Sequence, residues 1–358
     1  MFEENIIVKK RVFIGMSGGV DSSVAAALLQ KRGYDVTGVT FQLSGVETAE
    51  GCCGWETIRD AKLICGKLGI PHYVLNYKDI FQEKVIDVFV QETLNGQTTN
   101  PCVTCNRDIK FGAFLAWSLS NGADLVASGH YAKIVYQDNI PFLAAAADKS
   151  KDQSYFLHQL TTDQLKYIDF PLGDLIKKEV RKIAEEMNLH VAQKKESQGM
   201  CFARGNYTDY TNQLFQQYMG EGEIITTDGK VIGKHRGALS YTIGQKRGGL
   251  IYYRGTKSPD VLRVIGKNIE KNQLIVGHKD TIQVNAHHII GGKFRGNLNN
   301  NIFAVNRYHG EPIPVDNIVR TSDDIFHITL KENVALTAPG QSVVLYENNM
   351  VVGGGISI

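Results

Sequence analysis

The sequence predicts an α/β protein: a doubly wound parallel sheet, followed by a small basic middle domain and a C-terminal β-barrel. Three observations support this fold class. Strand and helix patterns alternate up to about Ser128, which is typical of a parallel sheet with helices on both faces. From Leu160 to about Met219 the pattern is helical. After Glu223 it changes to short apolar strands separated by Gly, Asn and Asp, which is typical of small barrels.

The expected strands of the first half are short apolar runs, and the expected helices repeat apolar residues every three or four positions. The strands are Arg11–Met16, Val36–Gln42, His72–Asn76 and Leu125–Ser128, and the helices are Asp21–Lys31, Thr57–Leu68, Ile80–Leu94 and Asp108–Leu119.

The same criteria predict the elements of the second half. The helices are Thr162–Ile168, Ile176–Met187 and Tyr207–Tyr218, and the strands are Ile224–Thr227, Val261–Gly266, Leu274–Val276, Ile302–Val305, Ile325–Leu330 and Val343–Tyr346. We therefore divide the chain into an α/β domain at 1–205, a middle domain at 206–280 and a barrel domain at 281–358.

The composition of the 358 residues, 21% of them charged, is that of a soluble globular protein. The N-terminus contains acids and no long apolar run, so we expect neither a signal peptide nor a membrane span. Six cysteines in a chain of this size indicate a reducing cytosol rather than a secreted disulfide framework, so we expect a cytoplasmic protein. The segment Ile224–Ile275 carries ten Lys and Arg against three acids, which suits a phosphate-rich partner, although a solvated basic face has the same composition.

The segment Val12–Ser23, VFIGMSGGVDSS, carries the strongest functional signal. Its apolar strand breaks at Ser17-Gly18-Gly19, and a helix is expected from about Asp21. Glycines let the backbone approach a ligand closely, and the N–H groups at a helix start form an anion site. Asp21 could hold a magnesium ion on the phosphates. The string resembles the PP-loop of ATP pyrophosphatases, which release pyrophosphate and leave AMP on an oxygen; the bland alternative is an ordinary Gly-rich turn.

Two cysteines, Cys102 and Cys105, lie three residues apart in the segment Asn100–Asn106, just ahead of an expected helix. A thiol near a helix N-terminus has a lowered pKa and is a better nucleophile or metal ligand. Arg107 and Lys110 would act in the same direction. A pair with this spacing alone would also fit a redox dithiol or half of a zinc site.

A third candidate, Cys201, lies in the cation-rich loop Lys194–Gly205, whereas Cys65 is expected to pack in the core and the vicinal pair Cys52-Cys53 has no assigned role. Three cysteines together with an adenylating loop indicate a reaction that replaces an activated oxygen with sulfur. Adenylation turns a carbonyl oxygen into a leaving group, and sulfur carried on a cysteine can replace it. A second thiol then releases the sulfur, or a metal centre holds it.

The chain resembles the tRNA-specific 2-thiouridylases over nearly its whole length. The strings GMSGGVDSS, NPCVTCNRDIKF, ASGHYA, DKSKDQSYFL, VRKIAEEMNL, KKESQGMCF, GQKRGGL and APGQS occur in the order found in that family. The family thiolates the wobble uridine of certain tRNAs. The resemblance implies that domain 1–205 binds ATP and is catalytic, and that domain 206–280 binds tRNA. It also implies a persulfide-donating sulfur carrier or cysteine desulfurase as partner, with 2-thiouridine, AMP and pyrophosphate as products.

The resemblance also implies roles for single residues. Cys105 matches the nucleophile, and Cys201 matches the cysteine that carries the persulfide. The ATP contacts are expected at Gly15, Met16, Ser17, Gly18, Gly19, Val20, Asp21 and Ser22, with Phe41 at the adenine and Gly129 close to the nucleotide. The target base is expected beside Asn100, Pro101 and Cys102, and the tRNA contacts at His130, Lys151, Asp152, Gln153, Arg307, Tyr308 and Gln341.

Three alternatives stay open at this point. Many family members have Asp where this chain has Cys102, so Cys102, Cys105 and Cys201 could instead hold an iron–sulfur cluster with one open iron. A PP-loop amidating ligase would use ammonia in place of sulfur, and it predicts that serine at Cys105 and at Cys201 retains activity. An RNA-binding protein that uses ATP only as a structural ligand predicts tRNA binding without turnover.

Overall fold

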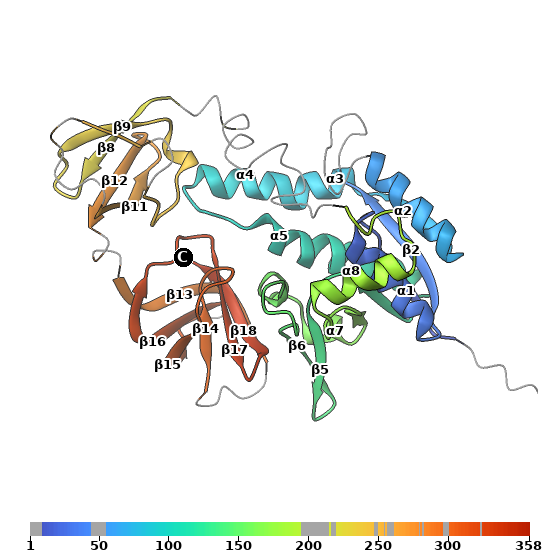
Figure 1. Cartoon of the computed structure of the whole chain (residues 1–358). Helices are drawn as coiled ribbons and strands as arrows, with labels where there is room; N and C mark the ends of the chain where they lie inside the picture. The colour runs from blue at the N-terminus through green and yellow to red at the C-terminus, as the bar shows by residue number, and fades with distance from the viewer. Residues whose placement is uncertain are drawn as a thin grey trace, which may run out of the picture. The chain divides into compact units, whose positions relative to one another are not determined.

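The computed structural model describes residues 9–43, 55–194, 215, 220–246, 250–253, 255, 261–278, 280, 283–295, 301–322 and 324–358 (Figure 1). The chain forms two compact units. The first unit consists of Met1–Val85, Cys102–Phe202 and Asn349–Val351, and the second of Ile86–Pro101, Ala203–Asn348 and Val352–Ile358. No helix in the described part of the chain has the length and apolar character that a bilayer span requires.

The first unit is built on a parallel sheet. Its strands are β1 (Arg11–Gly15), β2 (Asp35–Gln42), β3 (His72–Asn76), β4 (Leu125–Ser128) and β7 (Ile168–Asp169), in the order β3-β2-β1-β4-β7. Every neighbouring pair is parallel. This confirms the predicted sheet. β7 corrects the helix expected at Thr162–Ile168, because helix α7 (Thr162–Leu165) ends early and a two-residue strand pairs with β4.

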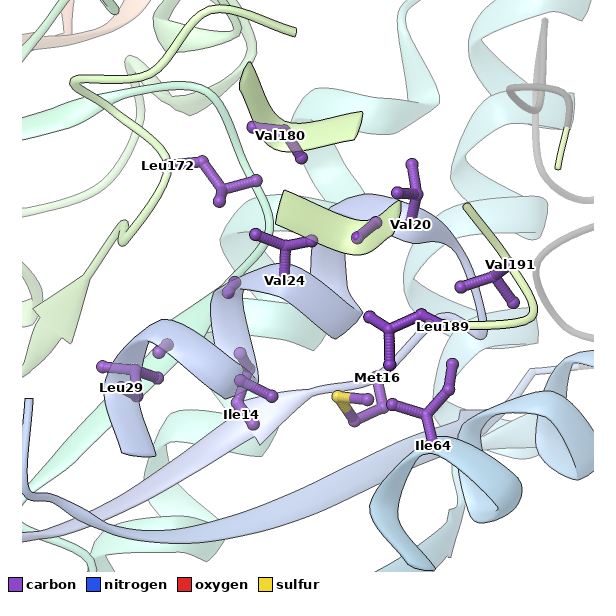
Figure 2. Close-up of a cluster of buried hydrophobic side chains, with 14 of the residues drawn as sticks. Ile14, Met16, Val20, Val24, Leu29, Ile64, Leu172, Val180, Leu189 and Val191 are labelled. Atoms are coloured by element: carbon purple, nitrogen blue, oxygen red, sulfur yellow. The ribbon is translucent and has the colours of Figure 1, made fainter. Parts of the chain in front are cut away.

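Helices cover both faces of this sheet. Alternate side chains of β1 point to opposite faces, so they pack against different helices. Val12 and Ile14 join a buried cluster with α1 (Val20–Lys31), α2 (Trp55–Leu68) and α8 (Lys177–Glu186), and Figure 2 shows part of this cluster. Phe13 contacts Trp117 of α6 (Phe114–Ser120) through rings whose centroids lie 5.7 Å apart. The doubly wound arrangement follows from this alternation.

Two long helical stretches are interrupted by π-helical turns. The first comprises α3 (Lys78–Phe81), η1 (Gln82–Ile86) and α4 (Asp87–Leu94), and the second comprises α5 (Pro101–Thr104), η2 (Cys105–Ala113) and α6. The second begins at Pro101, seven residues before the predicted start at Asp108. Proline is favoured at the first helical position, because its missing N–H has no helical partner there. The two thiols therefore lie within the helical stretch and not ahead of it.

The hairpin of β5 (Lys133–Gln137) and β6 (Ile140–Ala144) was not expected from the sequence. Its turn residues Asp138 and Asn139 both have positive φ, at 50° and 62°, as a tight two-residue hairpin requires. A short 3-10 helix, η3 (Ser154–Leu157), follows.

The second unit contains two sets of strands. The first set is β8 (Gly222–Thr226), β9 (Val231–His235), β10 (Ile251–Tyr252), β11 (Leu262–Asn268) and β12 (Gln273–His278), with the 3-10 helix η5 (Ala238–Ser240). Their order is β10-β9-β8-β12-β11, and Ile224, Val264 and Leu274 form part of a buried core. β8 and β12 are parallel, whereas the pairs β10–β9, β9–β8 and β12–β11 are antiparallel.

The second set closes into an antiparallel six-stranded barrel, as predicted. Its strands are β13 (Gln283–Phe294), β14 (Phe303–Val305), β15 (Ile313–Arg320), β16 (Ile325–Ala335), β17 (Ser342–Glu347) and β18 (Met350–Ser357). They run in the order β13-β16-β15-β14-β17-β18, and β18 pairs back with β13. The barrel interior is apolar and includes Ile289, Ile328 and Val343.

His287 on β13 makes the barrel sensitive to acid. The side chain is 2% exposed, its Nε2 has no hydrogen-bond partner among the described residues, and burial lowers its pKa to about 4. In the unfolded chain the imidazole of His287 binds a proton near pH 6.5, whereas in the folded barrel it stays neutral until about pH 4. The free energy of unfolding therefore falls as the pH drops from 6.5 towards 4. The loss should reach roughly 3 kcal/mol.

We expect His287→Leu to remove this part of the pH dependence, as measured by urea unfolding between neutral and acidic pH. Ile290, an exposed side chain on the same strand that does not titrate, provides the control variant Ile290→Ala, which should keep the pH dependence of the parent chain. If the free energy of unfolding depended on pH in the same way in His287→Leu and in the parent chain, His287 would not be the source of the acid sensitivity.

Candidate nucleotide and thiol site

The turn from β1 into α1 has the geometry of a phosphate loop. Gly18 has a φ of +62°, and a Cβ there would lie 2.6 Å from the carbonyl oxygen of Thr57, so only glycine fits. Gly19 is the N-cap residue of α1 and provides no side-chain cap. Ser22 Oγ accepts a hydrogen bond from the N–H of Ser17 at 3.2 Å, which folds the turn over the helix start. The N–H groups at this helix end are thus arranged to bind an anion.

Gly129 brings the end of β4 against the same helix start. A Cβ at this position would lie 2.7 Å from the backbone N of Ser22 and 2.9 Å from the carbonyl carbon of Asp21. Both contacts are to backbone, which cannot rotate away. The expected nucleotide residues Met16, Val20 and Gly129 therefore lie in one place, where the carboxyl ends of β1 and β4 meet α1.

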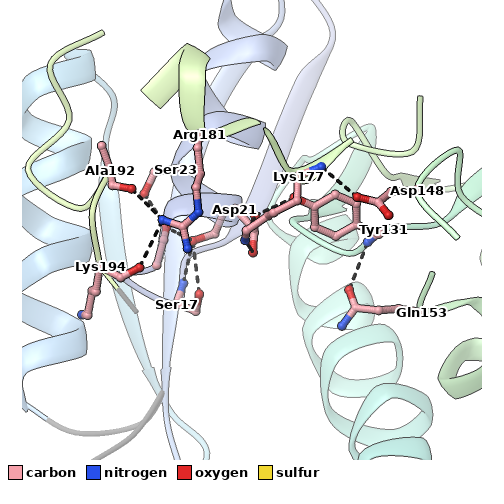
Figure 3. Close-up of polar contacts among 12 residues, drawn as sticks. Ser17, Asp21, Ser23, Tyr131, Asp148, Gln153, Lys177, Arg181, Ala192 and Lys194 are labelled. Atoms are coloured by element: carbon pink, nitrogen blue, oxygen red, sulfur yellow. Dashed lines mark hydrogen bonds and ion pairs between the residues drawn. The ribbon is translucent and has the colours of Figure 1, made fainter. Parts of the chain in front are cut away.

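Asp21 is held by a cation and a phenol (Figure 3). Lys177 Nζ donates to both carboxylate oxygens at 2.7 Å, and Tyr131 Oη donates to Oδ1 at 2.9 Å. Lys177 is the first residue of α8, and its own N–H donates to Asp148 Oδ2 at 2.9 Å. The Lys177 ammonium also lies 5.7 Å from the centre of the Tyr131 ring.

A second lysine supports the loop from the other side. Lys194 Nζ donates to the carbonyl of Gly18 at 3.3 Å and to Asp60 Oδ2 at 2.7 Å. Burial opposes the ionisation of Asp60, but Lys194 and Arg59 outweigh it, so the pKa of this carboxyl is lowered. Arg181 of α8 donates to the carbonyl of Ala192 at 2.8 Å, which holds the segment that carries Lys194 (Figure 3).

Phe41, the expected adenine contact, lies at the end of β2 beside Gly15. A Cβ on Gly15 would lie 3.7 Å from the Phe41 ring. The ring stacks on Tyr77 at 5.6 Å and meets Phe114 edge-on at 4.9 Å. The structure therefore places an aromatic wall next to the phosphate loop.

The thiols lie at the start of the second helical stretch. Cys102 is the second residue of α5, and Cys105, which is 5% exposed, opens η2. Arg107, one of the two cations expected to act on the thiols, is paired with Asp108 at 2.7 Å and also donates to Gln159 at 2.7 Å. Asp108 therefore offsets the charge of Arg107.

The remaining cysteines divide into two groups. Cys65 is 1% exposed in the core, where burial raises the pKa of its thiol to about 11, which confirms the packing role. Cys201, the expected persulfide carrier, and the pair Cys52-Cys53 lie outside the described residues, as does the helix expected at Tyr207–Tyr218 apart from Phe215. Among the residues that are described, no group of three His, Cys, Asp or Glu side chains is arranged to hold a metal.

His130, an expected tRNA contact, is a neutral imidazole in the interior of the first unit. It is 9% exposed; burial, and next the charge of Lys110, lower its pKa well below the usual value. Lys110 Nζ lies 3.4 Å from Nε2, and an ammonium can only donate, so Nε2 accepts and Nδ1–H donates to Ser128 Oγ at 2.7 Å. A contact of His130 with RNA would therefore not be an ion pair.

The turn Lys151–Gln153, the next set of expected tRNA contacts, is tied to its surroundings. Asp152 Oδ1 accepts from the N–H of Ala146 at 2.9 Å, and Gln153 Oε1 accepts from the N–H of Tyr131 at 3.0 Å. These two side chains therefore shape the strand ends around Tyr131.

The last expected tRNA contacts lie in the second unit. Tyr308 is 38% exposed and its ring lies 3.9 Å from that of His309, next to Arg307. Gln341 Nε2 donates to the carbonyl of Thr98 at 2.5 Å, and the N–H of Thr98 donates to the carbonyl of Pro339 at 2.7 Å. The structure thus brings Gln341 to the segment that leads into Asn100 and Pro101.

Sequence reasoning missed Lys177 and Tyr131, which contact Asp21 from positions 156 and 110 residues away. Tyr131 lies within the string ASGHYA, and Lys177 stands just ahead of VRKIAEEMNL. Neither string indicates which side chain points to the loop.

Comparisons with known proteins cover the whole of this architecture. Family models match residues 10–205, described as a tRNA methyl transferase HUP domain, residues 209–278, described as a tRNA methyl transferase PRC-barrel domain, and residues 279–357, described as an aminomethyltransferase beta-barrel domain. The tRNA-specific 2-thiouridylase MnmA of Clostridioides difficile is 40% identical over 98% of this chain and 99% of its own. The chain belongs to the tRNA-specific 2-thiouridylase family. The protein of the same name from Clostridium acetobutylicum is also 40% identical, over 98% of this chain and 99% of its own.

The 2-thiouridylase family is a family of enzymes, and this chain is one of them. A third member, from Beijerinckia indica, is 40% identical over 96% of this chain and 84% of its own. Among solved structures, the NMN synthetase of Francisella tularensis matches 59% of this chain and 77% of its own at 18% identity, with a TM-score of 0.34. That likeness is too weak to bear on the site.

Proposed function

We propose that this chain is a tRNA uridine 2-sulfurtransferase that adenylates O2 of the anticodon wobble uridine with ATP and then replaces that oxygen with sulfur. The observation that carries the proposal is the full-length similarity to proteins named tRNA-specific 2-thiouridylase. The phosphate loop and the thiols Cys102 and Cys105 also belong to the same compact unit.

ATP fits the loop by the chemistry of its residues. The uncapped start of α1 and the glycines at 18 and 129 form a narrow cradle of backbone N–H groups, and the Phe41 ring stands beside it. Magnesium, when bound with the triphosphate, neutralises charge on the leaving pyrophosphate, and Asp21 is the residue that would hold it. The uridine oxygen attacks the α-phosphorus, pyrophosphate leaves, and the C2–O bond becomes easy to break.

The cysteines supply the sulfur in this proposal. The terminal sulfur of a Cys201 persulfide attacks C2 of the uridine, and AMP leaves with the oxygen. Cys105 then attacks the Cys201 sulfur, which breaks the S–S bond, releases 2-thiouridine and leaves a Cys105–Cys201 disulfide. In the other route Cys105 attacks that sulfur first, and the hydrosulfide that leaves attacks C2 in place of the persulfide. In both routes a dithiol reductant must reopen the disulfide before the next turnover. Cys105 is the fifth residue of the helical stretch that begins at Pro101, one turn after Cys102.

A four-iron, four-sulfur cluster on Cys102, Cys105 and Cys201 is the competing form of the same reaction. Two of the three ligands are one helical turn apart at 102 and 105, which suits a shared metal centre. The pure persulfide form needs only Cys105 and Cys201. Iron and sulfide analysis of anaerobically purified protein separates the two, because full thiolation without iron excludes the cluster.

We propose tRNA as the macromolecular substrate, a persulfide-donating carrier or cysteine desulfurase as the source of sulfur, and the cytoplasm as the place of action. The boundaries 1–205, 206–280 and 281–358 are our proposed functional division: ATP and chemistry in the first part, tRNA binding in the second and the barrel in the third. The family models divide the chain at 205 and 209 and at 278 and 279, which supports this division.

The test of the proposed function uses nucleoside mass spectrometry and product analysis. A deletion strain should lack 2-thiouridine at the wobble position, and the purified enzyme should form AMP and pyrophosphate only when tRNA is present. Formation of ADP and phosphate instead would refute the assignment of the loop. Binding of tRNA without release of pyrophosphate would favour the non-enzymatic alternative.

The basic middle segment predicts a salt-dependent affinity for tRNA. With about six phosphate contacts, affinity should fall by roughly 10³-fold between about 50 and 200 mM salt, because phosphate contacts release counterions. Exchanging Lys246 and Arg247 for Ala should lower the slope of log affinity against log salt concentration by about two, and it should weaken binding to all tRNAs equally. Lys166→Ala, an exposed lysine paired with Asp163 in the first unit, is the control and should leave the slope unchanged. Affinity that is insensitive to salt would show that these charges face solvent.

A further inference from the structure

The barrel loop Ala338–Gln341, which joins β16 to β17, holds both backbone groups of Thr98. The N–H of Thr98 donates to the carbonyl of Pro339 at 2.7 Å, and Gln341 Nε2 donates to the carbonyl of Thr98 at 2.5 Å. Because a carbonyl can only accept, the nitrogen of the Gln341 amide must face Thr98. A single loop of the barrel therefore fixes the peptide groups on both sides of the Thr98 Cα atom.

Gly340 allows the barrel loop to approach this segment closely. Its φ is +92°, a conformation that residues with a Cβ rarely adopt. A Cβ at this position would lie 3.0 Å from Gln97 Cβ, 3.0 Å from the backbone N of Thr98 and 3.1 Å from its carbonyl carbon. Two of these three atoms are backbone, which cannot rotate away. An alanine at position 340 would thus push directly on Gln97 and Thr98.

The barrel loop is itself anchored to the last strand of the barrel. The N–H of Gly340 donates to the carbonyl of Ser357 on β18 at 2.9 Å, and the N–H of Ser357 donates to the carbonyl of Gln341 at 2.8 Å. A shift of the loop away from Thr98 would break both hydrogen bonds. The strain of a substitution in the loop therefore passes to the segment around Thr98.

The segment that the barrel loop holds leads directly to the residues expected beside the target base. Residues 97–100 belong to no helix or strand, and α5 begins at Pro101. A segment of this kind depends on tertiary contacts for its position, because it has no ladder of backbone hydrogen bonds of its own. Asn100 follows Thr98 by two residues, so the two Cα atoms are at most about 7 Å apart. A displacement of Thr98 is thus transmitted to Asn100 and Pro101.

We infer that the barrel loop is a positioning element of the thiolation site: it fixes Thr98, and through Thr98 it sets where Asn100 and Pro101 meet the target uridine. This role rests on the proposed function, which places the uridine beside these two residues. Gln341 is then a positioning residue that acts through Thr98, in place of the direct tRNA contact that the resemblance implies. All the contacts that support this role lie within the second compact unit.

The experiment separates the turnover of bound tRNA from the affinity for tRNA. With ATP and a supplied persulfide, Gly340→Ala should form 2-thiouridine roughly 10- to 100-fold more slowly at saturating tRNA, because a misplacement of about 1 Å costs about 10²-fold in turnover. Gln341→Met, which keeps the length of the side chain but cannot donate, should lower turnover about 3- to 10-fold. Equilibrium binding of tRNA should stay within about threefold of the parent in both variants. Since both changes act through Thr98, the double variant should be little slower than Gly340→Ala alone.

Gly291→Ala is the matched control. Gly291 also lies in the barrel at a positive φ, +67°, but a Cβ there meets nothing within 4 Å. Alanine at this position strains the backbone in the same way without touching the segment around Thr98. It should lower the resistance to urea and keep the turnover of the parent chain. An equal loss of turnover in both glycine variants would show general damage to the barrel and would overturn the positioning role.

The remaining outcomes distinguish the positioning role from the proposed function. Parent turnover in both Gly340→Ala and Gln341→Met would overturn the positioning role. A loss confined to tRNA affinity would overturn it as well, because Gln341 would then be a direct tRNA contact. Absence of 2-thiouridine from the reaction of the parent chain would overturn the proposed function instead. If Gly340→Ala does not fold, Gln341→Met decides through the same two measurements.

Discussion

Serine at Cys105 or at Cys201 is expected to abolish the formation of 2-thiouridine while ATP and tRNA still bind. A serine hydroxyl can neither carry a persulfide nor exchange with one, because both steps need a thiolate. Loss of a covalent nucleophile should reduce the rate by more than about 10³-fold. The measurement is 2-thiouridine formed per enzyme, with nucleotide binding as the check that the variant is folded.

Cys65→Ala is the matched control, since this thiol is in the core and its pKa is raised to about 11 by burial. It should lower stability modestly and keep thiolation. Cys102→Ser then separates the two forms of the mechanism. If the enzyme uses only a persulfide, this variant should keep substantial activity. If it uses an iron–sulfur cluster, the variant should lose its iron and most of its activity. Full activity in both Cys105→Ser and Cys201→Ser would instead point to the amidating ligase.

Alanine at Gly129 is expected to disable the nucleotide site. Its methyl group would lie 2.7 Å from the backbone N of Ser22 and 2.9 Å from the carbonyl carbon of Asp21, so β4 and α1 must separate. Overpacking of this kind costs about 1–3 kcal/mol in stability. Displacing the helix start by even 1 Å should cost about 10²-fold in turnover. Unfolding in urea and pyrophosphate release measure the two effects.

Gly66→Ala provides the control for this change. Gly66 lies on the exposed side of α2, and a Cβ there meets nothing within 4 Å. Alanine should stabilise the helix by roughly 0.5–1 kcal/mol and leave turnover unchanged. If Gly129→Ala behaved like Gly66→Ala, the close approach of β4 to α1 would not matter for function.

Local patterns were sufficient to predict most of the fold. The strand at 72–76 was predicted with its observed bounds, and α1 and α2 each began within two residues of the expected position. Errors occurred where tertiary contacts decide the secondary structure. β7 has two residues and exists because β4 provides a partner. The start of the helical stretch at Pro101 was missed because this proline was not read as the first residue of a helix.

The candidate site was predictable only where its residues follow one another in the chain. Gly18, Gly19 and Asp21 form a readable string, and the glycine requirement at 18 follows from its positive φ. The partners of Asp21 come from α8 and from the segment after β4, and nothing local marks them. The charge on Arg107 is offset by its neighbour Asp108, which shows that a cation near a thiol in sequence is not always available to it.

The hydrogen bonds at Thr98 have a consequence for the order in which the enzyme is completed. Thr98 is synthesised 243 residues before Gln341, and both of its backbone groups bond to residues 339 and 341. At ~5–20 residues per second, the ribosome needs roughly 12–50 s to reach them. The parallel sheet can assemble meanwhile, but the stretch that enters α5 gains these bonds only after residues 339 and 341 have been synthesised. The segment that leads to Cys102 and Cys105 is thus completed later than the parallel sheet, whose strands all lie before residue 170.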